Sequence, residues 1–178
     1  MRLRPIAPED APRLIAGLEL LTDETRFARF FFLKRAFSAT ELEHLTQCDG
    51  INHLALVVEG IDDPQRQLIA VGRWIRDPQA PELASIAYVT SDRWQRLGIG
   101  ERLVRELARE ALARGIAKFR AEILWGNAAA VKLLERVGVR EKEVMIGSGA
   151  SELIYRIDLA EVADAGRTAA ASRQRSSS

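Results

Sequence analysis

The amino-acid sequence predicts a mixed fold in which β-strands alternate with α-helices. Two observations lead to this prediction. Short apolar segments bounded by turn residues recur along the chain, and such segments are typical of buried strands. Between them lie segments whose apolar residues repeat at helical spacing, the longest at residues 98–114. The length of 178 residues suits one domain with a hydrophobic core, and the alternation places it in the mixed α and β class.

The first third of the chain is expected to hold one strand and three helices. The strand is expected at residues 3–6. The first helix begins near Pro12, with Asp10 as its cap and one apolar face made of Leu14, Ile15, Leu18 and Leu21. A short helix follows within residues 22–32, and the capping box Ser38-Ala-Thr-Glu41 opens a third helix.

The middle of the chain is expected to alternate between strands and helices. Three buried strands are expected at residues 54–59, 68–75 and 83–90. The helix at 98–114 follows, and Gly115 is a natural stop for it. Its apolar face consists of Ile99, Leu103, Val104, Leu107, Ala108, Ala111 and Leu112.

The last third is expected to add a strand at 117–125, a helix at 128–137 and two closing strands. Asn127 is placed to cap that helix and Gly138 to end it, and the closing strands fall near Val144 and at 153–159. Residues 160–178 contain few bulky apolar side chains, so we expect a flexible C-terminal tail after a domain at 1–159.

The composition excludes several function classes. The formal net charge is +1, which provides no general field for nucleic acid or for an anionic membrane. No segment is apolar and long enough to span a bilayer, and the N-terminus has no signal-peptide pattern. One cysteine cannot form an intrachain disulfide. We therefore expect a cytoplasmic protein with neither nucleic acid nor membrane as its partner.

The segment that carries chemistry is the turn between the strand at 83–90 and the helix at 98–114. It has the sequence Gln95-Arg96-Leu97-Gly98-Ile99-Gly100, followed by Glu101. Backbone N–H groups at a helix N-terminus are unpaired and carry the positive end of the helix dipole. Glycines let that backbone approach an anion closely, and Arg96 adds a formal charge. The turn is therefore a sensible pyrophosphate site.

Other phosphate-binding loops fit this turn poorly. A P-loop needs Lys followed by Ser or Thr after its last glycine, whereas Glu101-Arg102 stand here. The dinucleotide fingerprint needs a third glycine, and Leu103 occupies its place. The remaining alternative is that Gly98 and Gly100 only shape a strand-to-helix turn.

The turn resembles the acetyl-CoA loop of the GNAT superfamily of N-acetyltransferases. That loop reads Gln or Arg, two residues, Gly, any residue, then Gly or Ala, and Gln95, Gly98 and Gly100 match it. A second segment, Asn127 to Val139, resembles the later helix of the family, although Val139 replaces the usual aromatic residue. The resemblance covers nearly all of residues 1–159. Its N-terminal half is most similar to the acetyltransferase domain of bacterial protein lysine acetyltransferases.

The resemblance implies a fold and a co-substrate. The fold is a central, mostly antiparallel sheet with a splayed pair of parallel strands and helices on both faces. Acetyl-CoA would lie in the splay, and no metal is implied. The turn from Gln95 to Glu101 would hold the pyrophosphate. The backbone of Tyr88, Val89 and Thr90 would pair with the pantetheine arm and polarise the thioester carbonyl, and Asn127 would contact the cofactor or simply cap its helix.

The catalytic groups that the family commonly uses are replaced in this sequence. Leu134 stands where a Tyr often serves as the acid, and Ser85 stands where the lysine-acetyltransferase relatives favour a Glu base. Glu82 and Glu122 are the nearby carboxylates that could take the proton from the amine through water, or could simply be solvated. Tyr88 could supply a phenol near the thioester. We therefore name Glu82, Ser85 and Glu122 as the candidate catalytic residues.

The sequence thus predicts an acyltransferase that moves acetyl from acetyl-CoA to a primary amine, either a protein lysine or a small molecule. The alternative is a non-catalytic acyl-CoA-binding regulatory module, which Leu134 and Ser85 favour. A nucleic-acid-binding domain is disfavoured because the sequence has no basic stripe. The sequence leaves the acceptor open, and also whether the chain forms a homodimer.

Overall fold

The computed structural model describes residues 1–60, 67–137, 145–146, 152–160 and 162. The described strands are β1 (Arg2–Pro5), β2 (His53–Glu59), β3 (Leu68–Arg76), β4 (Leu83–Thr90), β5 (Lys118–Leu124), β6 (Met145–Ile146) and β7 (Glu152–Asp158). The helices are α1 (Ala11–Glu19), α2 (Asp23–Phe30), α3 (Ala39–Thr46), α4 (Ile99–Leu112) and α5 (Ala128–Val137), with 3-10 turns at Pro8–Asp10 and Asp92–Trp94.

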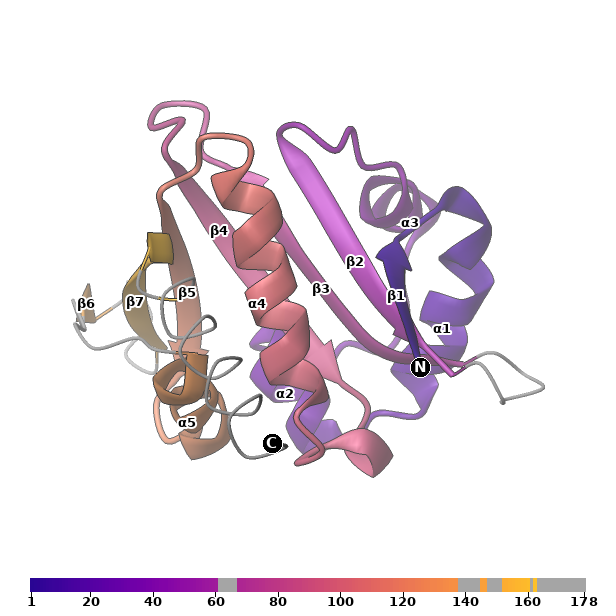
Figure 1. Ribbon diagram of the computed structural model, residues 1–178. Coiled ribbons are helices and arrows are strands. Elements are labelled where there is room, and N and C mark those ends of the chain that lie inside the picture. Colours follow the sequence, from indigo (N-terminus) through magenta and orange to yellow (C-terminus); the bar gives the residue numbers. More distant parts are fainter. Residues whose placement is uncertain (61–66, 138–144, 147–151, 161, 163–178) are drawn as a thin grey trace, which may run out of the picture.

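The strands form one sheet in the order β1-β2-β3-β4-β5-β7-β6 (Figure 1). All neighbouring pairs are antiparallel except β4 and β5, which run parallel. The predicted mixed class with one parallel pair is therefore confirmed. Several predicted features lie outside the described residues, namely Gly138, Val139, Val144 and most of the tail. Val162, which follows the predicted domain boundary, is buried in the core.

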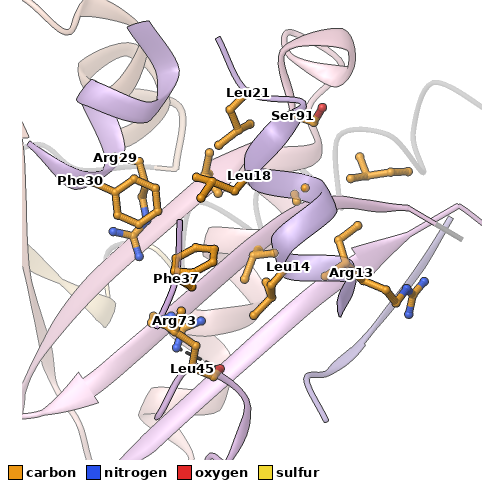
Figure 2. A pocket seen from close by; sticks show the side chains of 16 residues that line it. Arg13, Leu14, Leu18, Leu21, Arg29, Phe30, Phe37, Leu45, Arg73 and Ser91 are labelled. Atoms are coloured by element: carbon orange, nitrogen blue, oxygen red, sulfur yellow. Dashed lines mark hydrogen bonds between the residues drawn. The ribbon is translucent and has the colours of Figure 1, made fainter. Parts of the chain in front are cut away.

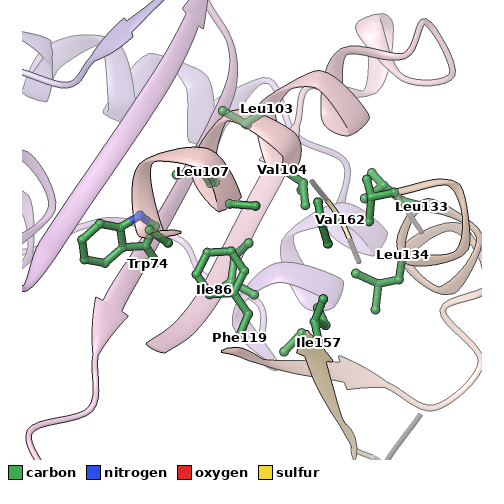
Figure 3. Packing of buried hydrophobic residues seen from close by; sticks show 14 of the residues in the cluster. Trp74, Ile86, Leu103, Val104, Leu107, Phe119, Leu133, Leu134, Ile157 and Val162 are labelled. Carbon is green, nitrogen blue, oxygen red and sulfur yellow. The ribbon is translucent and has the colours of Figure 1, made fainter. Parts of the chain in front are cut away.

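Helices cover both faces of the sheet. On one face α4 and α5 close the main core, where Trp74, Leu103, Leu107, Phe119 and Leu134 are almost fully buried (Figure 3). On the other face α1 and α3 pack over a smaller core around Leu14 and Val57 (Figure 1). The strong amphipathic pattern of α4 explains its position, because its whole predicted apolar face except Leu112 is buried.

The predicted helix starts are confirmed in α3 and α5. Ser38 Oγ accepts from the N–H of Glu41, and the Glu41 carboxylate accepts from the N–H of Ser38, which completes the predicted capping box. Asn127 Oδ1 accepts from the N–H of Ala130 at 3.0 Å, as the sequence predicted for a cap of α5. Thr22 caps α2 through the N–H of Thr25.

Asp10 stands at the N-cap position of α1, as predicted, but its side chain forms no capping hydrogen bond to the helix. Its carboxylate, 3% exposed, accepts from the N–H of Ala7 and from the guanidinium groups of Arg4 and Arg13. Both arginines also reach Glu59, so this ion network joins β1, α1 and the end of β2. The adjacent Arg4 guanidinium lowers the pKa of Asp10 to about 2. Ile15, expected on the buried face of α1, is 42% exposed, because only Leu14, Leu18 and Leu21 face the sheet.

Candidate functional site

The parallel strands β4 and β5 separate halfway along their length. Their pairing covers four residue pairs, from Leu83–Lys118 to Ile86–Ala121, and then stops. Beyond that point residues 87–90 pair only with β3, and residues 122–124 pair only with β7. The edge of β4 that faces β5 therefore carries backbone groups with no strand partner among the described residues. We call this opening the fork.

The predicted turn leads from the fork to the start of α4. Gly98 is the N-terminal cap of α4 with φ +77°, and Arg96 has φ 62°, so two residues adopt the left-handed conformation that L side chains rarely take. The N–H groups of the first turn of α4 have no partner within the helix and carry its positive dipole end. The N-terminal N–H groups of α4 therefore lie beside the fork.

The two glycines of the turn meet different surroundings. A Cβ on Gly98 would have no atom within 4 Å, and Gly98 borders a hollow of about 170 Å³ that Arg2 and Arg102 also line. A Cβ on Gly100 would lie 2.8 Å from Leu133 Cδ1, so Gly100 is required for the packing of α4 against α5. The space beside Gly98 is therefore open, whereas the space beside Gly100 is filled by the packing of α4 against α5.

The other side chains of the turn are used within the protein or point to solvent. Gln95 Nε2 donates to the backbone oxygen of Thr90 at 3.2 Å, and Leu97 is exposed. Glu101 forms an ion pair with Arg105, 3.0 Å apart. Asp92 accepts hydrogen bonds from Thr22 and Thr25, which fastens the turn to the start of α2. This scaffold fixes the turn in place, and its backbone remains the part that can hold an anion.

The side chains of β4 beyond the fork alternate between the two faces of the sheet. Val89 points to the face covered by α1, where it lines a pocket. Tyr88 packs against the main core, and Thr90 lies beside Gly100. The Tyr88 phenol oxygen is buried without a hydrogen-bond partner among the described residues. Burial raises the pKa of Tyr88 well above its usual range, so its phenol keeps its proton at neutral pH.

The three candidate catalytic residues are spread along the parallel pair. Glu82 is exposed and precedes β4, at the end of the strand opposite the turn. Ser85 is exposed on β4 and pairs in register with Arg120 of β5. Glu122 is the first residue of β5 beyond the paired region, and its carboxylate forms an ion pair with Arg120 at 2.9 Å. The structure therefore brings Ser85 and Glu122 to the fork, whereas Glu82 lies away from it.

Two residues near the site were not singled out from the sequence. Trp125 follows β5 at the mouth of the fork and is 73% exposed, an unusual place for a large aromatic side chain. Arg73 lies in the middle of β3 and is 5% exposed. The signal for Arg73 was present, because a lone arginine interrupts the apolar run 68–75.

Cys48 is partly buried, and burial raises the pKa of its thiol, which disfavours a nucleophilic role.

A forked parallel pair that leads into a glycine turn at a helix N-terminus defines a class of acyl-CoA-dependent transferases. The chain belongs to the acetyltransferase (GNAT) domain family, because the model of that family matches residues 1–140. The resemblance seen in the sequence is thereby confirmed. Acetyl-CoA-dependent N-acetylation is the typical activity of that family.

Known proteins agree with this assignment. Over 137 residues the chain is 32% identical to acetyltransferase Pat of Mycolicibacterium smegmatis. This match covers 76% of the present chain but only 40% of the longer Pat protein. The crystal structure of the GNAT domain of S. lividans PAT matches with a TM-score of 0.78 at 26% identity, covering 88% of this chain and 89% of that one. The yncA protein of Salmonella typhimurium, solved with its cofactor acetyl-CoA, shares the fold, with a TM-score of 0.68 at 15% identity and coverage of 89% and 93%.

Among the described residues, none of the helices is long and apolar enough to cross a membrane.

Proposed function

We propose that this chain transfers the acetyl group of acetyl-CoA to a primary amine, on a protein lysine or on a small molecule. The observation that carries the proposal is the continuity of the fork with the turn. One strand, β4, leaves its partner after Ile86 and leads directly to the N-terminus of α4. An extended acyl-CoA has the matching shape, with an amide-bearing arm at one end and a pyrophosphate at the other.

The residues present fit acetyl-CoA. The edge of β4 at Tyr88, Val89 and Thr90 offers backbone groups to an extended arm, in the way that an added strand would pair, although the Thr90 oxygen also accepts from Gln95. The N–H groups of Gly98 to Glu101 and the charge of Arg96 suit the pyrophosphate, and the open space at Gly98 leaves room for it. Asn127 borders the other side of the fork. When bound, acetyl-CoA supplies the acetyl group as an activated thioester.

The acceptor amine is proposed to approach from the face of the sheet that carries Ser85 and Glu122. Both side chains are exposed there. An amine must be neutral to attack, so a group at the fork has to take its proton. We assign this role to Glu122, directly or through water, with Arg120 keeping its carboxylate in place. Ser85 can hold the water, and Glu82 is assigned no role.

Tyr88 is the residue we assign to donate a hydrogen bond to the departing thiolate, which then takes its proton from water, because a phenol with so high a pKa keeps its own proton. Its phenol is protonated, buried and without a partner among the described residues, and it stands two residues beyond the last pair of β4 and β5. This hydrogen bond would stabilise the leaving thiolate where the family's usual acid is replaced by Leu134. Leu134 itself is buried in the main core.

Changing Tyr88 to Phe is expected to lower kcat about 100-fold, because one hydrogen bond to a developing negative charge typically contributes this much. The melting temperature should stay the same or rise, since the change removes a buried hydroxyl that has no partner among the described residues. Steady-state kinetics and thermal unfolding of Tyr88→Phe test both statements. An unchanged kcat would remove Tyr88 from the mechanism.

The experiment that tests the function is release of free thiol from acetyl-CoA in the presence of a panel of primary amines and lysine peptides. Turnover that depends on the amine supports the proposal. The alternative, a non-catalytic acyl-CoA-binding module, predicts saturable binding of acetyl-CoA with no thiol release for any amine. The non-catalytic alternative is favoured by Ser85 and Leu134, which replace the usual base and acid of the family. The thiol-release assay separates an acetyltransferase from a module that only binds acyl-CoA.

A further inference from the structure

A pocket lies on the opposite face of the sheet from α4, between α1, α2 and β3. Its cavity has a volume of about 60 Å³, which suffices for a small polar group and not for a bulky ligand. Most of the residues that line it are apolar, among them Leu14, Leu18, Phe30, Phe37 and Leu45. Its cationic groups are Arg13, Arg29 and Arg73, and none of the described residues that line it is a carboxylate (Figure 2).

Arg73 enters this pocket from the sheet. Its guanidinium donates to the backbone oxygen of Leu45 at 3.2 Å and lies 3.2 Å from His53 Nε2. The Nε of Arg73 is buried without a partner among the described residues. Burial, with the neighbouring Arg73 charge next, lowers the pKa of His53 to about 4, so the ring is neutral and accepts the hydrogen bond. Within the described part of the chain, Arg73 therefore has neutral partners and no counter-ion.

Arg29 enters the same pocket from α2. The residue is partly exposed, but its guanidinium points into the pocket toward the wall that carries Arg73 (Figure 2). Within the described part of the chain, its one polar or aromatic contact is with the Phe30 ring, whose centroid lies 4.9 Å from the guanidinium carbon of Arg29. Burial lowers the pKa of both guanidinium groups to about 10, and for Arg29 repulsion by Arg73 adds to this.

Two guanidinium groups in one apolar pocket are costly without an anion. Removing a charged group from water is unfavourable unless it is paired, and two like charges repel each other. Arg13 illustrates the difference, because it lines the same pocket and is paired with Asp10 and Glu59. The two oxygens of a carboxylate match the paired N–H donors of a guanidinium group, and its negative charge would offset the charges of Arg29 and Arg73.

The pocket lies next to the fork on the face where the acceptor would approach. Arg73 pairs in register with Ala87, the first residue of β4 after its pairing with β5 ends. Directly opposite residues of neighbouring strands point to the same face of the sheet. Neighbouring strands are about 4.8 Å apart, so the backbone of Arg73 lies one strand away from the fork, and its guanidinium extends toward His53 of β2. Val89 and Ser91 of the same chain segment line the pocket.

We propose that this pocket binds the carboxylate of the acceptor, and that the acceptor is therefore a small amine that also carries a carboxylate. The inference rests on the proposed function. Arg29 and Arg73 hold the carboxylate, and the apolar walls contact the carbon chain that links it to the amine. The proposal narrows the acceptor from any primary amine to an amino acid or a related amino carboxylate.

The test uses ω-amino carboxylates of increasing chain length, each compared with the alkylamine of the same length. For at least one length, kcat/KM should be about 10- to 100-fold higher for the amino carboxylate, the range expected for a hydrogen bond to a charged group. Arg29→Met should abolish this preference, so that the two members of each pair react with similar kcat/KM. Arg26→Met is the matched control, since Arg26 lies on the same helix but bonds the backbone oxygens of Leu18 and Glu19.

A second readout does not depend on turnover. The amino carboxylates should raise the melting temperature of the full chain at constant ionic strength, the alkylamines should not, and Arg73→Met should lose the rise. Stabilisation of this kind without any thiol release would support the pocket and contradict the proposed function. Turnover with equal kcat/KM for both members of every pair, or a preference that persists in Arg29→Met, would overturn the pocket and leave the proposed function standing.

Discussion

Replacing Gly98 with alanine is expected to weaken acetyl-CoA binding about 10- to 100-fold. The added methyl group projects into the open space beside the turn, where no described protein atom lies within 4 Å, and there it would keep a phosphate away from the N-terminal N–H groups of α4. Because Gly98 has φ +77°, the substitution also strains the backbone and lowers the free energy of unfolding by about 1 kcal/mol. Calorimetric titration with acetyl-CoA and thermal unfolding measure the two effects.

The chain offers a closely matched control at the other end of the same helix. Gly115 also has φ +77°, and a Cβ added there would likewise have no described atom within 4 Å, but it follows the C-terminus of α4, away from the turn. Gly115→Ala should therefore lose as much stability as Gly98→Ala and keep the affinity of the wild-type protein. Equal affinities in the two variants would mean that the turn does not hold the phosphates.

Changing Glu122 to Gln is expected to lower kcat/KM for the amine on the order of 100-fold, because the amide cannot take a proton. The affinity for acetyl-CoA should stay the same, since Glu122 points to the acceptor face and not to the turn. The loss of its ion pair with Arg120 should change stability by less than about 1 kcal/mol, as for other exposed pairs. Steady-state kinetics with the best acceptor measures the effect.

Glu82→Gln is the control for this prediction. Glu82 is also an exposed carboxylate beside the parallel pair, but it precedes β4 and lies beyond the paired end. Its backbone oxygen, which accepts from the N–H groups of Ala117 and Lys118, is untouched by the substitution. Wild-type rates are expected for it. A larger loss of kcat/KM in Glu82→Gln than in Glu122→Gln would assign removal of the amine proton to Glu82 instead of Glu122.

Local patterns in the sequence were sufficient to predict most elements of the fold. The buried face of α4, the capping box at Ser38 and the cap at Asn127 each depend on a few neighbouring residues, and the structure confirms all three. The turn from Gln95 to Gly100 was likewise recognisable, because its glycines and the helix behind it are close in sequence. The parallel pair of β4 and β5 followed from the family resemblance rather than from the strands themselves.

Features that depend on distant residues could not be predicted in this way. Asp10 occupies the predicted N-cap position, but its carboxylate pairs with Arg4 and Arg13, which also bind Glu59, in an ion network that forms only when β1, α1 and β2 meet. A splay between β4 and β5 was expected from the family resemblance, but neither strand sequence marks Ile86 as the residue after which the pairing ends. Arg29 and Arg73 are 44 positions apart in the chain, so only the fold reveals that both enter one pocket. For the same reason, proximity to the fork, and not residue type, distinguishes Glu122 from Glu82.

The central claim is that the free edge of β4 beyond the fork and the first turn of α4 together hold acetyl-CoA. Amide hydrogen exchange of the full chain, with and without saturating acetyl-CoA, tests this claim most directly. We predict slower exchange at residues 87–90 and 98–101 when acetyl-CoA is present, and no change at residues 83–86, which already pair with β5. Unchanged exchange at both predicted segments under conditions of saturating binding would contradict the claim, because acetyl-CoA would then be bound elsewhere.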